Sequence, residues 1–189
     1  MVIVSVPAGR GATYDDLLKL PQNVVGEILD GELFASPRPG PRHANAETTL
    51  AAELHSAFQR GRGGPGGWWI LIEPELHLGP NVLVPDIGGW RRERLAALPE
   101  TAWFELSPDW VCEVVSPSTG RIDRAKKLPL YAHERVPFAW IVDPEQKTVE
   151  VLQLNGDLWT VVHVHSGDEQ MSAVPFESLS IDLRTLWTS

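Results

Sequence analysis

Two acidic residues occupy positions where a charged side chain is difficult to accommodate. Asp86 follows directly on Pro85 at the end of an apolar run, and Glu113 lies in the middle of the apolar run 110–115. A buried carboxylate without partners is costly enough that it normally pairs with a cation, shifts its pKa or binds a metal. Two such carboxylates on neighbouring strands could share one divalent ion.

The chemistry open to such a pair is metal-assisted hydrolysis. Mg2+ and Mn2+ prefer carboxylate oxygens, backbone carbonyls and water as ligands. A metal held there polarises a phosphoryl oxygen and lowers the pKa of bound water, and a nearby lysine would stabilise the charge of the transition state. The two acids therefore indicate a site for hydrolysis of phosphodiester bonds.

A set of strands and helices must bring these residues together. Stretches rich in β-branched and aromatic residues predict strands over 68–78, 82–90, 110–115, 139–143, 148–154 and 159–165. Apolar residues at helical spacing predict helices over 14–20 and 43–58, and the segment 121–134 between two of the strands is read as a third helix. The last helix would link two strands as a crossover. Asp30-Gly31 predicts a hairpin turn between strands over 24–29 and 32–35, and the segments 36–41 and 61–67 are predicted loops.

The composition narrows the class of protein. A net charge of −9 argues against wrapping of nucleic acid over the whole surface, because such binding depends on Lys and Arg. The single cysteine, Cys112, excludes an intramolecular disulfide. The chain begins without a basic, apolar leader and contains no apolar run of membrane-spanning length, so we expect a cytoplasmic protein without membrane contact.

Several short motifs follow one another in a specific order. They are Asp30-Gly31-Glu32-Leu33, Ser36-Pro37 with His43, Pro85-Asp86, Glu113-Val114-Val115-Ser116-Pro117-Ser118-Thr119, then Asp123, Lys127, Tyr131, Val136, Trp140 and Val142-Asp143-Pro144. Their order and spacing resemble the PD-(D/E)xK nuclease superfamily, and more closely its Uma-two family of restriction-endonuclease-like proteins. The resemblance covers most of the chain. It implies one α/β (α+β) restriction-endonuclease-like domain over residues 1–189, with a central mixed sheet flanked by helices.

The resemblance also implies roles for individual residues. Asp86 and Glu113 would be the metal ligands, assisted by the carbonyl of Val114. The superfamily pattern has a lysine two residues after the glutamate, where this chain has Val115. In the Uma-two pattern a lysine of the following helix takes its place, and Lys127 occupies that position.

Five further residues are candidate accessory groups: Glu47, Glu75, His43, Asp123 and Tyr131. Glu47 or Glu75 could add an outer metal ligand, although surface positions are the simpler interpretation. His43 could bind a phosphate or cap a helix end. Asp123 could orient Lys127, but we favour a helix cap. Tyr131 could pack above the site or cover core.

Structural interpretations compete with the catalytic ones. For Asp86 taken alone, a turn-initiating acid before Gly88-Gly89 is the favoured interpretation. Lys127 could be a solvated helix residue, and Pro129 should kink the helix that carries it. His163 and His165 share a strand face, but no third metal ligand is near them in sequence, so we do not predict a site there.

The leading prediction is a divalent-metal-dependent endonuclease that acts on DNA, as a homodimer because two-fold symmetry suits cleavage of both strands. The alternative is a non-catalytic module of the same fold that contacts protein or nucleic acid, which fits the acidic surface and the displaced lysine. An acid-pair glycoside hydrolase is disfavoured, since nothing in the sequence indicates a sugar-binding cleft.

Overall fold

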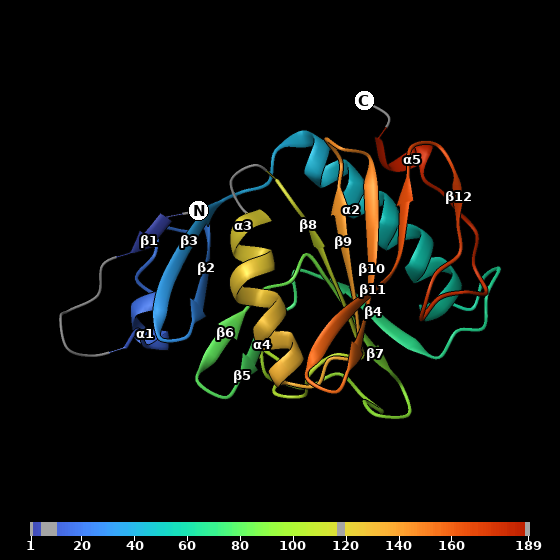
Figure 1. Ribbon diagram of the computed structural model, residues 1–189. Coiled ribbons are helices and arrows are strands. Elements are labelled where there is room, and N and C mark those ends of the chain that lie inside the picture. Colours follow the sequence, from blue (N-terminus) through green and yellow to red (C-terminus); the bar gives the residue numbers. More distant parts are fainter. Residues whose placement is uncertain (1, 5–10, 117–119, 188–189) are drawn as a thin grey trace.

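A six-stranded sheet organises the molecule (Figure 1). The computed structural model of the protein describes residues 2–4, 11–116 and 120–187, so part of the motif 113–119 lies outside the described residues. The strands run in the order β11 (Leu158–Ser166), β10 (Thr148–Asn155), β9 (Phe138–Asp143), β8 (Trp110–Val114), β7 (Ile87–Arg91) and β4 (Trp68–Ile72). Neighbours are antiparallel except β8 and β9, which are parallel. The sheet is therefore mixed, as predicted.

Helices cover both faces of this sheet (Figure 1). On one face lie α2 (Pro41–Leu54), its π-helical continuation η1 (His55–Gln59) and the short α5 (Arg184–Trp187). On the other face lie α3 (Gly120–Ile122), η2 (Asp123–Lys127) and α4 (Leu128–His133), which form the predicted crossover between β8 and β9. No helix among the described residues is long and apolar enough to span a membrane.

A second, smaller sheet lies beside the first. Its order is β1 (Val2–Val4), β3 (Glu32–Pro37), β2 (Val24–Leu29), β6 (Asn81–Leu83) and β5 (Leu76–Leu78). The predicted hairpin joins β2 and β3, and Asp30 and Gly31 have φ values of 52° and 77°, as a two-residue turn of this kind requires. Helix α1 (Tyr14–Leu17) packs on β2, and a two-stranded ribbon pairs β12 (Gln170–Met171) with β13 (Ile181–Asp182).

Two of the predicted strands are wrong as continuous elements. The stretch 68–78 breaks at Glu73-Pro74 into β4 and β5, and the stretch 82–90 breaks at Pro85 into β6 and β7. In both cases one half pairs in the large sheet and the other half in the small one. A proline cannot donate to a strand ladder, which favours a break at these positions. Asp86 therefore lies where the chain passes from one sheet to the other.

Candidate active site

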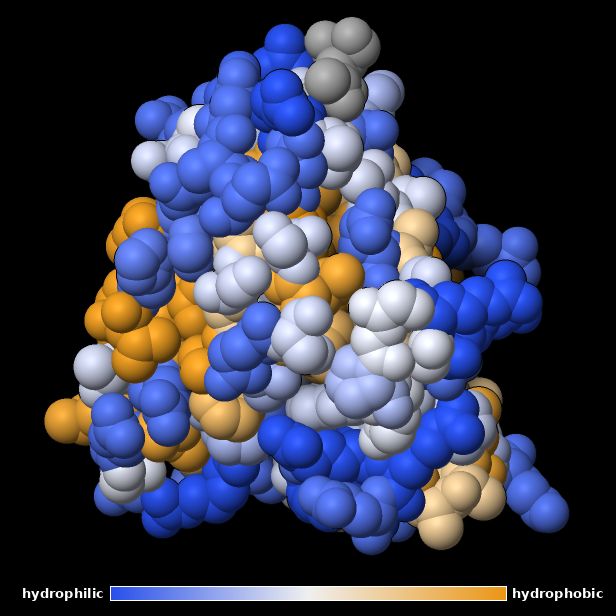
Figure 2. Space-filling model, turned by 90° about the vertical axis from the view of Figure 1, so that its right-hand side faces the viewer, coloured by the Kyte–Doolittle hydropathy of each residue, from blue (hydrophilic) through white to orange (hydrophobic). Residues whose placement is uncertain are grey.

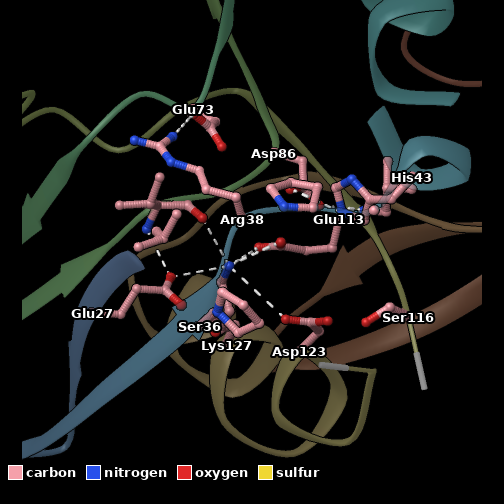
Figure 3. Close-up of a pocket in the computed structure, with 16 residues that line it drawn as sticks. Glu27, Ser36, Arg38, His43, Glu73, Asp86, Glu113, Ser116, Asp123 and Lys127 are labelled. Atoms are coloured by element: carbon pink, nitrogen blue, oxygen red, sulfur yellow. Dashed lines mark hydrogen bonds and ion pairs between the residues drawn. The ribbon is translucent and has the colours of Figure 1, made fainter. Parts of the chain in front are cut away.

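A cavity of about 240 Å3 lies between the two sheets and the helical segments (Figure 3). Its lining comes from segments far apart in the sequence: Val25, Glu27, Ser36, Pro37, Arg38, Pro39, Gly40, His43, Glu73, Val84, Asp86, Glu113, Val114, Ser116, Asp123 and Lys127. Most of the titratable side chains among these are acidic. Asp86, Glu113 and Lys127, the three residues predicted to carry the chemistry, all reach this one cavity.

Backbone contacts at the strand break fix the position of Asp86. Its Oδ2 accepts a hydrogen bond from the backbone N–H of Val114 at 2.6 Å. Its carbonyl accepts one from the N–H of Glu73 at 2.9 Å, at the other strand break. The carboxylate is thereby held against the end of β8, with Oδ1 directed towards the α2 side of the cavity.

Side chains of β8 alternate between the two faces of the sheet, and this alternation directs Glu113 to the face that α4 covers. Cys112 and Val114 pack in the core under α2, whereas Val111 and Val115 pack in the core under α4. Glu113 points the same way as Val111 and Val115, because side chains of a strand alternate between its two faces. It is buried, with 2% of its surface exposed, and it meets the helices that carry Lys127.

The ammonium group of Lys127 is surrounded by acceptors (Figure 3). Lys127 Nζ lies 2.8 and 2.9 Å from the two carboxylate oxygens of Glu113 and donates to the carbonyl of Val84 at 3.0 Å. It also lies 3.1 Å from Glu27 Oε1 and 4.0 Å from Asp123 Oδ1. Only 3% of Lys127 is exposed, so it is not a solvated helix residue. The π-helical turn η2, which ends at Lys127 just before Pro129, aims it into the cavity.

Glu27 belongs to this cluster and was missed by the sequence analysis. It is 3% exposed, and its Oε1 accepts the N–H of Val84 at 2.8 Å as well as facing Lys127. The signal that could have identified it is the one used for Glu113, an acid within an apolar strand, here Val24–Leu29.

Burial and charge together shift the pKa values of this group. Burial raises the pKa of Glu113 well above its ordinary value, against the lowering effect of Lys127. Burial alone would lower the pKa of Lys127, but Glu113 and Glu27 raise it well above its ordinary value. Burial, and then Glu113, raise the pKa of Tyr131, whose hydroxyl donates to Glu113 Oε1 at 2.6 Å. Lys127 is therefore charged and Tyr131 neutral at physiological pH.

His43 and Asp86 line the other side of the cavity, and Glu47 lies next to them. One potential ligand atom from each lies within 4.8 Å of the others. His43 Nε2 is 3.3 Å from Asp86 Oδ1, and His43 Nδ1 is 3.7 Å from Glu47 Oε2. Glu47 Oε1 and His43 Nδ1 are both buried without a hydrogen-bond partner. Glu113 is not part of this group. The candidate ligands grouped with Asp86 are therefore His43 and Glu47, whereas the predicted partner of Asp86 was Glu113.

On the His43 side of the cavity, the negative charges of Asp86 and Glu47 are only partly balanced by positive charge. Burial, and then Asp86, raise the pKa of Glu47 to about 7. Burial alone would lower the pKa of His43, but the hydrogen bond and the charge of Asp86 raise it above its ordinary value. Two acids facing one histidine, with a buried carboxylate oxygen unpaired, form a donor set that suits a hard divalent cation.

The remaining predicted residues fall in different places. Val114 lines the cavity through the backbone that also binds Asp86. Asp123 lies in η2, and its carboxylate faces Lys127; the cap interpretation involves residues 117–119, which lie outside the described residues. Glu75 does not line the cavity. It accepts a hydrogen bond from Tyr14 at 2.8 Å and contacts His77 at 2.7 Å.

The mouth of the cavity carries one exposed cation. Arg38, in the loop that precedes α2, pairs with Glu73 at 3.4 Å, and the side chain of Arg38 is 59% exposed (Figure 3). An exposed pair of this kind is weak and exchanges partners readily. Arg38 is therefore available to an anionic ligand that approaches the cavity.

The mixed sheet, the flanking helices and the acidic cavity with its lysine define a nuclease-like α/β protein. A crystal structure described as "a putative nuclease belonging to DUF820 from Anabaena variabilis ATCC 29413" has the same fold, with a TM-score of 0.75 and 22% identity over 93% of this chain and 97% of that chain. The family model "Uma2: Putative restriction endonuclease" matches residues 13–184, so the chain belongs to the Uma2 family, the Uma-two family that its motifs resemble. Comparison with curated proteins gave no match.

Proposed function

We propose that this protein is a divalent-metal-dependent DNA endonuclease, with Asp86, Glu113 and Lys127 at its active site. The observation that carries the proposal is the unpaired carboxylate oxygen of Glu47, which lies next to His43 and Asp86; these two residues line the same cavity as Glu113 and Lys127. A buried carboxylate that is only partly paired is costly, and a divalent cation would reduce that cost.

The residues present fit Mg2+ or Mn2+. Asp86 is common to both sets of candidate ligands: Glu113 and the carbonyl of Val114 on one wall, and Glu47 with His43 on the other. Carboxylate and carbonyl oxygens are the donors that these ions prefer, and imidazole is better tolerated by Mn2+. When bound, such an ion polarises a phosphoryl oxygen and lowers the pKa of a water ligand.

The chain's own residues supply position and charge. Lys127, held by Glu113, Glu27 and Val84, places a fixed positive charge beside the cavity, where negative charge develops during phosphodiester cleavage. Arg38 at the mouth would bind a backbone phosphate of the DNA, since Arg suits such contacts. Substrate phosphate would then displace the weak contact of Arg38 with Glu73.

One observation favours the alternative of a non-catalytic module. The ammonium of Lys127 already has acceptors in Val84, Glu113 and Glu27, which together match its three N–H groups. In that arrangement Lys127 stabilises the fold and is not free to contact a phosphate. The cavity would then bind nucleic acid or protein without cleaving it.

A plasmid-nicking assay with Mg2+ or Mn2+ separates the two functions. We expect the wild-type protein to nick supercoiled DNA and Asp86→Asn to lose the activity at least about a hundredfold, while the amide oxygen still accepts the Val114 N–H. Glu75→Gln is the matched control, because Glu75 lies outside the cavity. Equal nicking by Asp86→Asn would refute the proposed site, and retention of DNA without cleavage by the wild type would support the module.

The homodimer expected for double-strand cleavage would pair β11 with β11 of a second copy. β11 ends the large sheet, contains no Asp, Glu, Lys or Arg, and exposes the apolar side chains Leu158, Val161, Val162 and Val164. Figure 2 shows the face at the right of Figure 1, with an apolar area at its left-hand side. Antiparallel strand addition would extend the sheet across a two-fold axis. Val162→Lys should convert such a dimer to a monomer in light scattering; a monomeric wild type would exclude it.

A further inference from the structure

A second group of potential metal ligands lies at the end of β11, away from the cavity. His163 and His165 project from the same face of the strand, and their ring centroids are 4.1 Å apart. Glu169 follows the turn after β11, and its Oε1 lies 2.9 Å from His165 Nδ1. One potential ligand atom from each of the three residues lies within 4.8 Å of the others.

The fold brings the third ligand to the two histidines. His163 pairs with Val151 and His165 with Val149 across β10, so the two rings share a face by strand alternation. The chain then reverses at Gly167, whose φ of 61° favours glycine. Glu169 Oε1 also accepts the N–H of Ser166 at 3.0 Å, which directs the carboxylate back towards the histidines.

Contacts from neighbouring segments hold the turn in place. The N–H of Gly167 donates to the carbonyl of Lys147 at 2.9 Å, and the indole N–H of Trp187 donates to the carbonyl of Gly167 at 2.7 Å. The N–H of Leu183 donates to the carbonyl of Glu169 at 3.1 Å. The backbone of the three ligands is thus constrained before any ion binds, which reduces the entropy lost on binding.

We propose that His163, His165 and Glu169 form a second metal site, selective for a borderline ion of the Zn2+ type. Two imidazoles and one carboxylate are a donor set that suits Zn2+, Cu2+ or Co2+ and does not suit Mg2+. Bonds of about 2.1 Å in tetrahedral geometry need ligand atoms about 3.4 Å apart. Side-chain rotation of the exposed His163 and Glu169 closes the present separation.

The site would connect the nuclease-like core to its C-terminal segment. It joins the end of β11 to the residue before β12, and Trp187 of α5 is bonded to the same turn. Helix α5 packs against α2, which carries His43 and Glu47. Zn2+ bound here stabilises the segment that supports α2, without contributing a ligand to the cavity.

Zinc binding can be measured independently of the cavity and of nuclease activity. Calorimetry with Zn2+ is performed on the full chain in an Asp86→Asn background, which weakens the cavity as a competing site. His163→Ala and Glu169→Gln should each weaken Zn2+ binding at least about tenfold, since loss of even an outer partner costs about that much. His133→Ala is the matched control, because the side chain of His133 is 81% exposed and lies on α4.

Spectroscopy identifies the ligands directly. Cu2+ bound to the Asp86→Asn protein should show an electron paramagnetic resonance spectrum with nitrogen coupling from two imidazoles, reduced to one in His163→Ala. Zn2+ should also raise the melting temperature in that background, and should not do so in His163→Ala. Unchanged Zn2+ affinity in both ligand variants, or equal loss in His133→Ala, would overturn the proposal whether or not the protein cleaves DNA.

Discussion

The two sides of the cavity differ in how completely their charges are paired. On the α4 side, Lys127 is bonded to Glu113, Glu27 and the carbonyl of Val84, and Tyr131 donates to Glu113. On the α2 side, the side chains of Asp86 and Glu47 both contact His43, Asp86 also accepts the N–H of Val114, and Glu47 Oε1 has no hydrogen-bond partner among the described residues. The first side is complete without a ligand, whereas the second lacks positive charge.

Because of this difference, we expect the α4 side to determine the stability of the protein and the α2 side to determine ligand binding. Substitutions on the α4 side should unfold the protein, because they leave buried charges unpaired. Substitutions on the α2 side should change the response to metal and pH, because this side carries excess negative charge in the metal-free protein. Each prediction below would weaken or strengthen that division.

The largest effect is expected at Lys127. Lys127→Met removes the cation that contacts Glu113, Glu27 and Asp123 and should lower the free energy of unfolding by about 3–5 kcal/mol, measured by urea denaturation. Lys126→Met is the control, since Lys126 makes only exposed contacts worth about 0–1 kcal/mol. Equal stability of the two variants would contradict the assignment of Lys127 to a buried, paired cluster.

Removal of the Tyr131 hydroxyl should have a smaller effect. Tyr131→Phe leaves one oxygen of Glu113 with fewer donors and should cost about 1–3 kcal/mol in chemical denaturation, because Tyr131 is fully buried. In a Glu113→Gln background the same change should cost less, since the carboxyl acceptor is replaced by an amide. A cost that is identical in both backgrounds would show that the hydroxyl does not act through Glu113.

The pH dependence of stability should report on Glu47. In EDTA the folded protein keeps a proton on Glu47 up to about pH 7, whereas the unfolded chain loses it near pH 4.5. Between these values the folded state binds more protons, so the free energy of unfolding falls as pH rises. Glu47→Gln should flatten this part of the profile relative to wild type. If the free energy of unfolding depended on pH in the same way in both proteins, the pKa of Glu47 would not be raised by folding.

The smallest effect is expected at the mouth of the cavity. Arg38→Ala should weaken DNA binding several-fold in the absence of divalent metal, measured by fluorescence anisotropy. The slope of the logarithm of the binding constant against the logarithm of the salt concentration should fall by the amount that corresponds to about one phosphate contact. Arg60→Ala, an exposed arginine that does not line the cavity, provides the comparison. Identical salt slopes for wild type and Arg38→Ala would exclude Arg38 from phosphate binding.

Local sequence signals predicted much of the fold. Asp30-Gly31 specified its hairpin, and the strand-helix-strand crossover followed from two β-branched, aromatic stretches with a helical segment between them. The breaks at Glu73-Pro74 and Pro85 were missed, because both halves of each stretch are apolar and only their pairing in different sheets distinguishes them. These breaks bring Glu73 and Asp86 together, which no local pattern encodes.

The site was predicted less completely, for a physical reason. Glu113 and Asp86 stood out because acids are costly beside apolar strands, and the same reasoning applies to Glu27. Glu75 has the same residue type but lies with Tyr14 and His77, because strand direction after Pro74 turns it away from the cavity. The expectation that His163 and His165 lack a third ligand was wrong, since a tight turn returns Glu169 to them.

The central claim is that the α2 side of the cavity holds the divalent ion. Calorimetric titration of Mn2+ into wild type, Asp86→Asn, Glu47→Gln and the control Glu75→Gln tests it directly. We expect one Mn2+ site in the wild type and in Glu75→Gln, and binding at least about tenfold weaker in Asp86→Asn and Glu47→Gln. Wild-type affinity in both Asp86→Asn and Glu47→Gln would contradict it.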